Sequence, residues 1–281
     1  MSTNSVAGES QNYASRFVKL AWLSLTQLVR SPSHSRRAEA ARRSARHVVL
    51  LTAILGAAII AMMYLLDAHE IGWMPKRGTP SLWPIRILTD FGKSAYVLWA
   101  LAGLLVVVAV AAAGFRGISR ALLLGLATRV QFLFLAVLLP ALVGEVLKWT
   151  IGRGRPFVGG EDNVFNFRHF GGTEAFASFP SGHANTAFAL AFAVSALWPQ
   201  ARPVMIVYAT AIALSRLVLL AHHPSDVVAG ALVGVIGAMA VRYWFAARRL
   251  GFAIRLDGAI VPLPGPSLGH LKRVAGGASA P

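Results

Sequence analysis

Residues 48–66 read VVLLTAILGAAIIAMMYLL, an apolar run without a charged side chain. A helix needs about 20 mostly apolar residues to cross a bilayer, so this run predicts a membrane span. Residues 1–20 lack the sustained apolar core and small-residue cleavage site of a secretory signal. We therefore expect the run to remain in the protein as a membrane anchor.

Five further stretches are similarly apolar, although the third and fourth of them are slightly short. They are residues 95–113, 130–147, 181–198, 204–220 and 227–247. Backbone groups inside a bilayer need internal hydrogen-bond partners, so each stretch should be a helix. The sequence therefore predicts an all-α integral membrane protein with six transmembrane helices in a bundle. Residues 48–247 would form this membrane domain, preceded by a basic segment, 1–47, and followed by a tail, 248–281.

The composition excludes a soluble domain of ordinary type. Hydrophobic residues make up 56% of the 281 residues and charged residues only 14%, too few to solvate a globular surface of this size. The formal net charge of +16 is a feature of nucleic-acid-binding proteins, but the basic residues lie beside the apolar runs, which is typical of a membrane protein. No nucleic acid is expected as a partner. The chain has no cysteine, which excludes disulfides, Cys-ligated zinc and thiol nucleophiles.

The distribution of Lys and Arg predicts the orientation in an inner membrane. With six spans, most basic residues fall on the side that carries both termini, which should be cytoplasmic. Residues 67–94, 148–180 and 221–226 then lie on the periplasmic side. That side also carries basic residues, notably Lys148, Arg153, Arg155 and Arg216. Topology does not explain these residues.

Two segments outside the spans allow only coarse expectations. Residues 31–47, rich in Arg, Ser and Ala, can form a basic surface helix on anionic lipid. The simpler interpretation, which we favour, is a solvated tail that fixes the topology. The segment after residue 258 is rich in Gly and Pro and is expected to be loose.

The first of three polar clusters ends the third span and reads Lys148-Trp-Thr-Ile-Gly-Arg-Gly-Arg155-Pro156. Basic residues at a helix end usually reach for the membrane interface, which accounts for Lys148 alone. Gly152 and Gly154 break the helix, and Pro156 stiffens the exit. Such a loop can fold two cations toward one point, where Lys supplies a compact charge and Arg a planar fork that matches phosphate oxygens.

The second cluster, Pro180-Ser181-Gly182-His183, directly precedes the fourth span. Proline followed by serine is a common helix start, so helix capping is the simplest interpretation of Ser181. A helix start also presents free N–H groups and the positive end of the helix dipole to an anion. Gly182 would let the anion approach the backbone. His183, in the first turn, can donate a proton to a leaving group.

The third cluster reads Ser-Arg216-Leu-Val-Leu-Leu-Ala-His222-His-Pro-Ser-Asp226. Arg216 lies inside an apolar run, where a charge is costly and usually functional. His222 and Asp226 are four residues apart, and a carboxylate near an imidazole can fix its tautomer and leave the other ring nitrogen free to attack. His223 is a competing candidate for this role.

Together the clusters combine three cations, a helix N-terminus, two histidines and a carboxylate. This set suits binding of a phosphate dianion and transfer of its phosphoryl group to imidazole. A metal site is the rival interpretation, but the sequence has no HExxH pair and few carboxylates. We therefore expect no metal and no cofactor.

In order and spacing, the clusters resemble the signature of the type 2 phosphatidic acid phosphatase superfamily, and the predicted spans fit its membrane branch of lipid phosphatases. That signature reads Lys-x6-Arg-Pro, then Pro-Ser-Gly-His, then Ser-Arg-x5-His-x3-Asp. The chain matches it without departure over residues 148–226. Three motifs in this order at helix ends rarely arise by accident.

The resemblance implies a role for each residue of the signature. His222 would be the nucleophile that forms a phosphohistidine, Asp226 would orient it, and His183 would protonate the leaving oxygen. The implied phosphate-binding residues are Lys148, Arg155, Ser181, Gly182 and Arg216. The resemblance also favours His222 over His223, because only His222 has the required spacing to Arg216 and Asp226.

The implied activity is hydrolysis, without a metal, of a terminal phosphate or diphosphate on a lipid of the outer leaflet. Candidate substrates are phosphatidic acid, phosphatidylglycerophosphate, undecaprenyl diphosphate and lipid A. One alternative is a lipid phosphotransferase with the same phosphohistidine. Another is a non-enzymatic transporter or binder of phosphorylated lipids, which needs the cations but not the histidines. Soluble vanadium-dependent haloperoxidases share this pocket, but six spans argue against them.

Two further features lie outside the signature. Glu145 lies three residues before Lys148 and can either pair with it or sit alone at the interface. The loop 157–179 is rich in Phe and Gly and can shape the mouth that receives a lipid head group.

Overall fold

The computed structural model describes residues 3–158 and 164–264, with side chains from residue 13 onward. Part of the predicted loop 157–179 and most of the predicted tail 248–281 therefore lie outside the described residues. The helices and strands are α1 (Thr3–Val29), α2 (Arg37–Leu65), α3 (Asp67–Trp73), η1 (Pro80–Leu82), α4 (Trp83–Asp90), α5 (Ser94–Gly114), α6 (Gly117–Ile151), η2 (Glu174–Phe176), α7 (Gly182–Leu197), η3 (Pro199–Ala201), α8 (Arg202–Val218), α9 (Pro224–Ala247), β1 (Phe252–Ile254) and β2 (Ile260–Pro262).

Each of the six apolar stretches forms a helix. In the described part of the chain, five segments are long and apolar enough to cross a membrane: Arg37–Leu65, Pro80–Gly114, Gly117–Ile151, Pro199–Val218 and Pro224–Ala247. The remaining stretch forms α7, an apolar helix of 16 residues. The protein is therefore a largely helical, multi-pass membrane protein.

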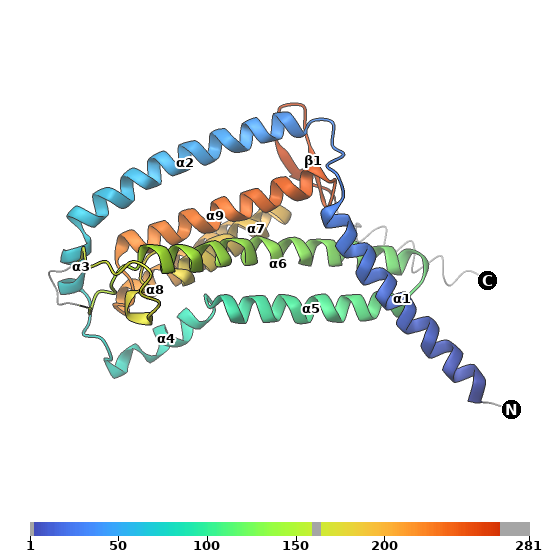
Figure 1. Cartoon of the computed structure of the whole chain (residues 1–281), viewed down its shortest axis with the longest axis horizontal. Coiled ribbons are helices and arrows are strands. Elements are labelled where there is room, and N and C mark those ends of the chain that lie inside the picture. Colours follow the sequence, from blue (N-terminus) through green and yellow to red (C-terminus); the bar gives the residue numbers. More distant parts are fainter. Residues whose placement is uncertain (1–2, 159–163, 265–281) are drawn as a thin grey trace.

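The long helices run back and forth along one axis (Figure 1). One end of the bundle carries α3, α4 and the loop between α6 and α7, while the N-terminus and the strands β1 and β2 lie toward the other end (Figure 1). The last turn of α6, the first turn of α7 and the junction of α8 with α9 all lie at the α3–α4 end. The fold thus brings the three polar clusters together.

Helix α7 is packed against α6, α8 and α9 in the interior of the bundle. Its buried face consists largely of alanines, and glycines on the neighbouring helices allow close approach. A Cβ atom on Gly234 of α9 would collide with the backbone oxygen of Asn185. A Cβ atom on Gly144 of α6 would lie 2.6 Å from Asn185 Nδ2, which donates a hydrogen bond of 2.7 Å to Pro140 O. This packing fixes the position of α7 along the bundle axis.

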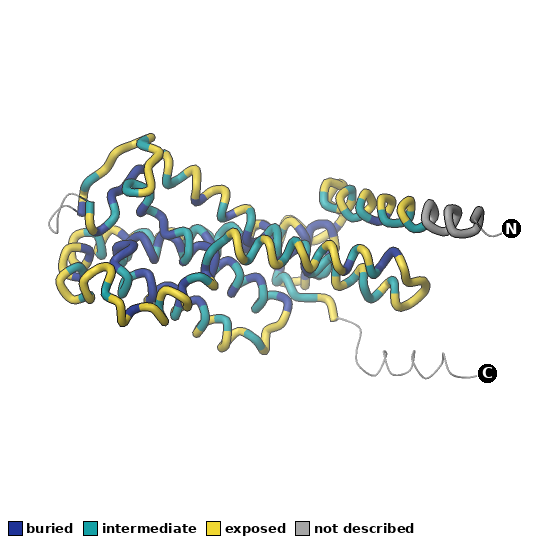
Figure 2. Tube along the Cα trace, turned by 90° about the horizontal axis from the view of Figure 1, so that it is seen from below, coloured by how far each residue is buried: buried dark blue, intermediate teal, exposed yellow. Residues whose placement is uncertain are grey.

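The outward faces of the bundle are apolar and exposed, as expected for contact with lipid. Figure 2 shows buried positions along the inside of the bundle and exposed positions on its outer helices. Trp99 is 78% exposed and Val207 68% exposed. An apolar surface of this extent would drive aggregation in water, whereas a bilayer satisfies it.

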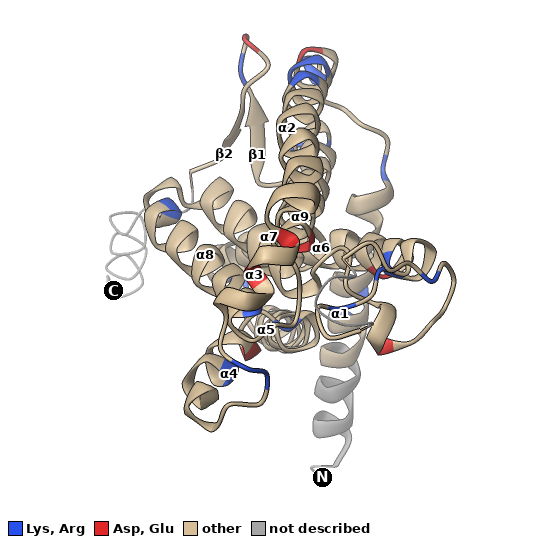
Figure 3. Ribbon diagram, turned by 90° about the vertical axis from the view of Figure 1, so that its left-hand side faces the viewer, with Lys and Arg blue, Asp and Glu red and all other residues tan. Residues whose placement is uncertain are grey.

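Three expectations from the sequence are wrong in detail. The fold is not all-α, because β1 and β2 form an antiparallel hairpin. The segment after residue 258 is not loose as far as residue 264, since it supplies β2, and Phe252 of β1 is buried against Phe132. Residues 37–47 are not a solvated tail, because they form the first turns of α2. Figure 3 shows the hairpin beside this part of α2, where Arg43 pairs with Asp257 at 2.9 Å.

The close approach of α7 and α9 gives a test of the packing. We expect Gly234→Ala to lower stability by about 1–3 kcal/mol, because overpacking displaces a neighbouring backbone. Thermal unfolding of the detergent-solubilised protein measures this loss. Gly103→Ala in α5 is the matched control, because nothing lies within 4 Å of its Cβ position. Equal behaviour of the two variants would contradict the packing described here.

Candidate active site

The loop after α6 is shaped by Gly152. This residue ends α6 with a left-handed conformation, φ = 61°, which favours glycine. A Cβ atom there would also collide with the carbonyl of Arg168. The Gly152 carbonyl accepts a hydrogen bond of 2.7 Å from Arg168 N, and Gly154 N donates one of 2.8 Å to Asn166 O. The loop therefore folds back on itself and returns Arg155 toward the bundle.

Lys148 lies directly beside the N-terminus of α7. A Cβ atom on Gly182 would be 2.9 Å from Lys148 Nζ, so glycine leaves room for the ammonium group. Lys148 Nζ also pairs with Glu145 Oε1 at 2.6 Å. In the structure Glu145 therefore pairs with Lys148 and does not sit alone at the interface, although its carboxylate is 70% exposed.

The start of α7 carries two polar groups that have no hydrogen-bond partner in the described part of the protein. Ser181 is the N-cap residue, yet its side chain makes no capping hydrogen bond. Within the described residues, Ser181 Oγ and His183 Nε2 are buried without a hydrogen-bond partner. Buried polar groups are normally hydrogen-bonded, so these two atoms point to an external ligand. Capping does not explain Ser181.

Two arginines approach this point from other elements. Arg155 donates hydrogen bonds to Glu174 O at 2.8 Å and Glu174 Oε2 at 3.0 Å. Burial lowers the pKa of the Arg155 guanidinium, while Glu174 acts against this change. Arg216, from the last turn of α8, donates to Thr89 Oγ1 of α4 at 2.8 Å, and its Nε has no partner in the described part of the chain. Both side chains retain N–H groups for an anion.

His222 is held in one tautomer by a backbone carbonyl. Its Nδ1 lies 2.7 Å from Ser178 O. A carbonyl only accepts hydrogen bonds, so Nδ1 carries the proton and Nε2 of the neutral ring carries the lone pair. Burial, followed by the charges of Arg216 and Arg155, lowers the pKa of His222 well below its usual value. The ring is therefore neutral and nucleophilic at neutral pH.

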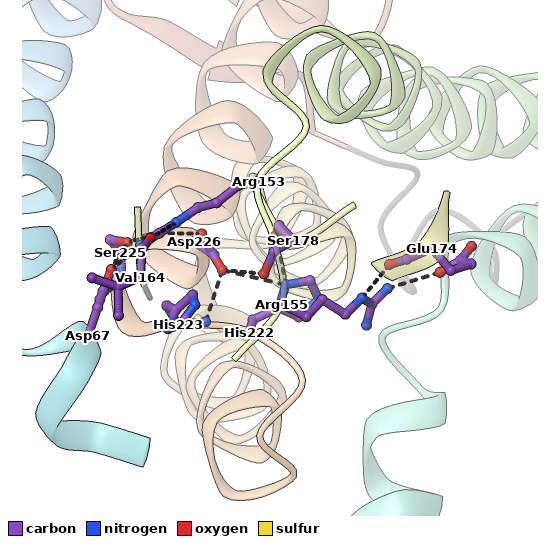
Figure 4. A network of polar contacts seen from close by, with 10 residues as sticks. All are labelled: Asp67, Arg153, Arg155, Val164, Glu174, Ser178, His222, His223, Ser225 and Asp226. Atoms are coloured by element: carbon purple, nitrogen blue, oxygen red, sulfur yellow. Dashed lines mark hydrogen bonds and ion pairs between the residues drawn. The ribbon is translucent and has the colours of Figure 1, made fainter. Parts of the chain in front are cut away.

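Asp226 lies farther from His222 than the sequence suggested. Its Oδ2 is 4.0 Å from His222 Nδ1. The same oxygen accepts hydrogen bonds from Ser178 Oγ at 2.6 Å and from His223 N at 2.9 Å. Asp226 therefore contacts the imidazole through Ser178, whose carbonyl makes the direct hydrogen bond (Figure 4). His223 is buried with its backbone N–H on this carboxylate.

A buried guanidinium connects Asp226 to the first half of the chain. Arg153 is fully buried, and its Nη1 lies 2.7 Å from Asp226 Oδ1 while its Nη2 lies 2.8 Å from Asp67 Oδ2 (Figure 4). It also donates to Val164 O and to Ser225 Oγ. Ser225 donates in turn to Asp67. We call Asp67, Arg153, Ser225 and Asp226 the buried network.

The sequence did not identify every residue of this site. Arg153 was noted only as a basic residue that topology does not explain. The flanking residues Gly152 and Gly154 could have identified Arg153. They indicate a tight loop, and a second arginine in a tight loop needs hydrogen-bond partners of its own. Asp67, Ser178 and Thr89 gave no signal of this kind.

Glu70 of α3 is a further carboxyl group close to the buried network. It is 3% exposed, and within the described residues neither side-chain oxygen has a hydrogen-bond partner. Burial, followed by the charges of Asp67 and Asp226, raises its pKa to about 8. Glu70 is thus protonated at neutral pH, so the buried network faces a neutral group.

Comparisons with known proteins show which family the chain resembles. A family model described as the PAP2 superfamily matches residues 129–250. The lipid A 1-phosphatase of Rhizobium johnstonii is 33% identical over 205 residues, which cover 72% of this chain and 82% of that protein. The lipid A 1-phosphatase of Rhizobium etli is 33% identical over 176 residues, covering 61% of this chain and 75% of that protein.

A third relative matches a shorter stretch of the chain. The putative undecaprenyl-diphosphatase YbjG of Escherichia coli is 35% identical over 107 residues, covering 36% of this chain and 50% of that protein. No solved structure matches the chain.

The buried network predicts a large effect of removing its cation. We expect Arg153→Met to lower stability by about 3–5 kcal/mol, because it leaves two carboxylates buried without a counter-charge. Thermal unfolding in detergent measures the loss, and Arg168→Met, which removes an exposed arginine of the same loop, is the control. A loss no greater than that of the control would show that the network contributes little to stability.

Glu70 predicts a pH dependence of stability. Below about pH 4.5 the carboxyl is protonated in both states, but between about pH 4.5 and 8 only the unfolded chain loses the proton, so stability falls as pH rises. Glu70→Gln removes this dependence. Its stability relative to the unsubstituted protein should therefore increase from about pH 5 to about pH 8. Glu39→Gln, which removes an exposed carboxyl, is the control, and the same trend in both variants would refute the assignment.

Proposed function

The chain belongs to the PAP2 superfamily and is a membrane lipid phosphatase, and we propose that it hydrolyses a terminal phosphate or diphosphate of a lipid through a phosphohistidine on His222. The observation that carries this proposal is the hydrogen bond of 2.7 Å between His222 Nδ1 and Ser178 O. It leaves Nε2 as the free nucleophile in a site that gathers cations around a helix N-terminus.

In the first step, His222 Nε2 attacks the phosphorus atom, and the bond between phosphorus and the lipid oxygen breaks. His183 protonates the departing oxygen, a role that its buried and unpartnered Nε2 supports. Lys148, Arg155 and Arg216 hold the phosphoryl oxygens together with Ser181 Oγ and the N–H groups at Gly182. Cations and a helix N-terminus aimed at the reacting phosphoryl group stabilise its charge in the transition state.

In the second step, water attacks the phosphohistidine. His183, now neutral, accepts a proton from this water, and the phosphorus–nitrogen bond breaks. Inorganic phosphate leaves, and His222 returns to its neutral form. Asp226 steadies His222 through Ser178, which supports a positioning role for Asp226. No step requires a metal or a cofactor.

The distribution of basic residues supports an orientation in the inner membrane. We place both termini in the cytoplasm and the site at the periplasmic face, because Lys and Arg are concentrated on the side of the termini. In this arrangement α7 also spans the membrane, as the fourth of six transmembrane helices in chain order. Residues 1–47 and 248–281, which precede and follow the membrane domain 48–247 in the sequence, are then both cytoplasmic. The substrate is reached from the outer leaflet.

Among the candidate lipids, the relatives favour lipid A. Two of them are named lipid A 1-phosphatase, and the one matched over a shorter stretch is named a putative undecaprenyl-diphosphatase. Lipid A is therefore the first substrate to test, followed by undecaprenyl diphosphate, phosphatidic acid and phosphatidylglycerophosphate.

The nucleophile gives the direct test of this mechanism. We expect His222→Ala to reduce phosphate release by about a thousandfold or more, because removal of a nucleophile removes the covalent pathway. His169→Ala, which changes an exposed histidine of the outer loop, should retain activity. The unsubstituted protein should release phosphate in EDTA and carry acid-labile phosphate after an alkaline quench. Full activity of His222→Ala would place the nucleophile elsewhere, and loss of all activity in EDTA would refute the metal-independent mechanism.

A further inference from the structure

A second cationic pocket lies beside the catalytic site. Its volume is about 330 Å³, and its lining includes Lys76 and Arg77 together with Pro156, Phe157 and Leu220. Lys76 and Arg77 belong to the loop between α3 and η1, at the end of the bundle that carries the active site (Figure 1). We call this cavity the Lys76–Arg77 pocket.

The pocket is continuous with the catalytic residues along the chain. Pro156 directly follows Arg155, and Leu220 precedes His222 by two residues. Burial is the main cause of the lowered pKa of Arg155, and the charge of Arg77 acts in the same direction. The two guanidinium groups are therefore close enough to repel each other. An anion between them would relieve this repulsion.

The two cations are exposed but held in a defined loop. The Thr79 N–H and hydroxyl both donate to Lys76 O, at 3.2 and 2.6 Å, and Arg86 donates to Thr79 O at 2.9 Å. The guanidinium of Arg77 lies 3.6 Å from the centroid of the Phe157 ring. Stacking fixes the plane of the guanidinium and leaves its N–H edge free for an anion.

Ordinary explanations for these charges are weak. Among residues 13–158 and 164–264, neither Lys76 nor Arg77 takes part in an ion pair. They lie at the end of the bundle opposite the termini, where the positive-inside bias does not call for basic residues. A ligand that brings negative charge accounts for both residues.

We infer that Lys76 and Arg77 bind a second phosphate group of the substrate while the first reacts at His222. The preferred substrates are then lipids with two phosphates, either joined as a diphosphate or carried on separate positions of the head group. This inference rests on the proposed function and narrows its substrate class. The apolar wall of the pocket, which includes Ile71, Met74 and Phe157, would contact the part of the lipid next to the second phosphate.

The second subsite also has a consequence for turnover. Binding energy from a group that does not react improves recognition of the substrate that carries it. Removal of the reacting phosphate leaves a product with a single phosphate, which cannot fill both sites at once. The product should therefore bind more weakly and be a poor substrate for a second round.

The test compares matched lipids with the full-length protein in detergent micelles. One pair is a prenyl diphosphate and the corresponding monophosphate, and the other is a bisphosphorylated disaccharide lipid and its monophosphorylated form. We expect Lys76→Gln/Arg77→Gln to lower kcat/KM about tenfold for lipids with two phosphates, because charge-assisted hydrogen bonds are lost. The same variant should change kcat/KM for the monophosphates less than about threefold, well short of the loss of one such bond. The lipid pair for which the variant loses the preference for two phosphates identifies the spacing between phosphates that the pocket recognises.

Two control variants separate this role from a general charge effect. Arg168→Gln removes an exposed arginine outside the pocket and should keep the preference. Lys76→Arg/Arg77→Lys retains both charges and should keep most of the preference for lipids with two phosphates. Equal losses on both kinds of lipid, or no loss on either, would overturn the inference.

A binding measurement keeps the inference separate from the proposed function. Inorganic pyrophosphate should raise the thermal stability of the unsubstituted protein more than the same concentration of orthophosphate, and Lys76→Gln/Arg77→Gln should abolish this difference. This readout needs no turnover. Absence of phosphate release from every lipid would refute the proposed function. Equal stabilisation by the two anions would refute a subsite for diphosphates, and an unchanged preference of Lys76→Gln/Arg77→Gln for the bisphosphorylated disaccharide lipid would refute the subsite for separate phosphates.

Discussion

The buried guanidinium of Arg153 is the constraint on which the site depends. It lies between Asp67 of α3 and Asp226 of α9, two carboxylates that would repel each other without it. Because Asp226 is fixed in this way, it can hold Ser178, and Ser178 in turn orients His222. The position of the proposed nucleophile therefore depends on Arg153, which makes no hydrogen bond to His222 within the described part of the chain. Taking charges out of water is expensive, so the network favours one defined geometry over loose alternatives.

The site is layered according to charge. The proposed phosphate-binding residues Lys148, Arg155 and Arg216 lie around the N-terminus of α7, whereas Asp226 of the buried network lies near His222 Nδ1, at 4.0 Å. A neutral carbonyl, rather than a carboxylate, makes the direct hydrogen bond to the imidazole. A carboxylate at that distance would favour the imidazolium, which cannot attack phosphorus. Burial and the charges of Arg216 and Arg155 keep the ring neutral by lowering the pKa of His222, while the Ser178 carbonyl fixes its tautomer.

Much of this arrangement could be predicted from sequence because it depends on local spacing. The apolar runs define the helices. Each motif lies at a helix end, and its members are only a few residues apart, as Lys148 and Arg155 are. Ser178 and Asp67 could not be predicted, because their roles depend on contacts between segments far apart in the chain. The hairpin of β1 and β2 was missed because strands of three residues show no periodicity. The position of α7 along the bundle axis depends on Gly144 and Gly234. Their contacts with Asn185 could not be predicted, because they form only when the helices pack together.

The buried network also bears on how the protein assembles. The ion pairs of Arg153 join residues that are 86 and 73 positions apart in the sequence. Contacts of such separation form after local structure, because closing a long loop costs conformational entropy. Insertion of individual helices into the bilayer therefore comes before completion of the site. A chain that has inserted only its first spans carries Asp67 without its partners and has no phosphate chemistry. The buried network is thus complete only when α9 has docked and Asp226 has reached the guanidinium of Arg153.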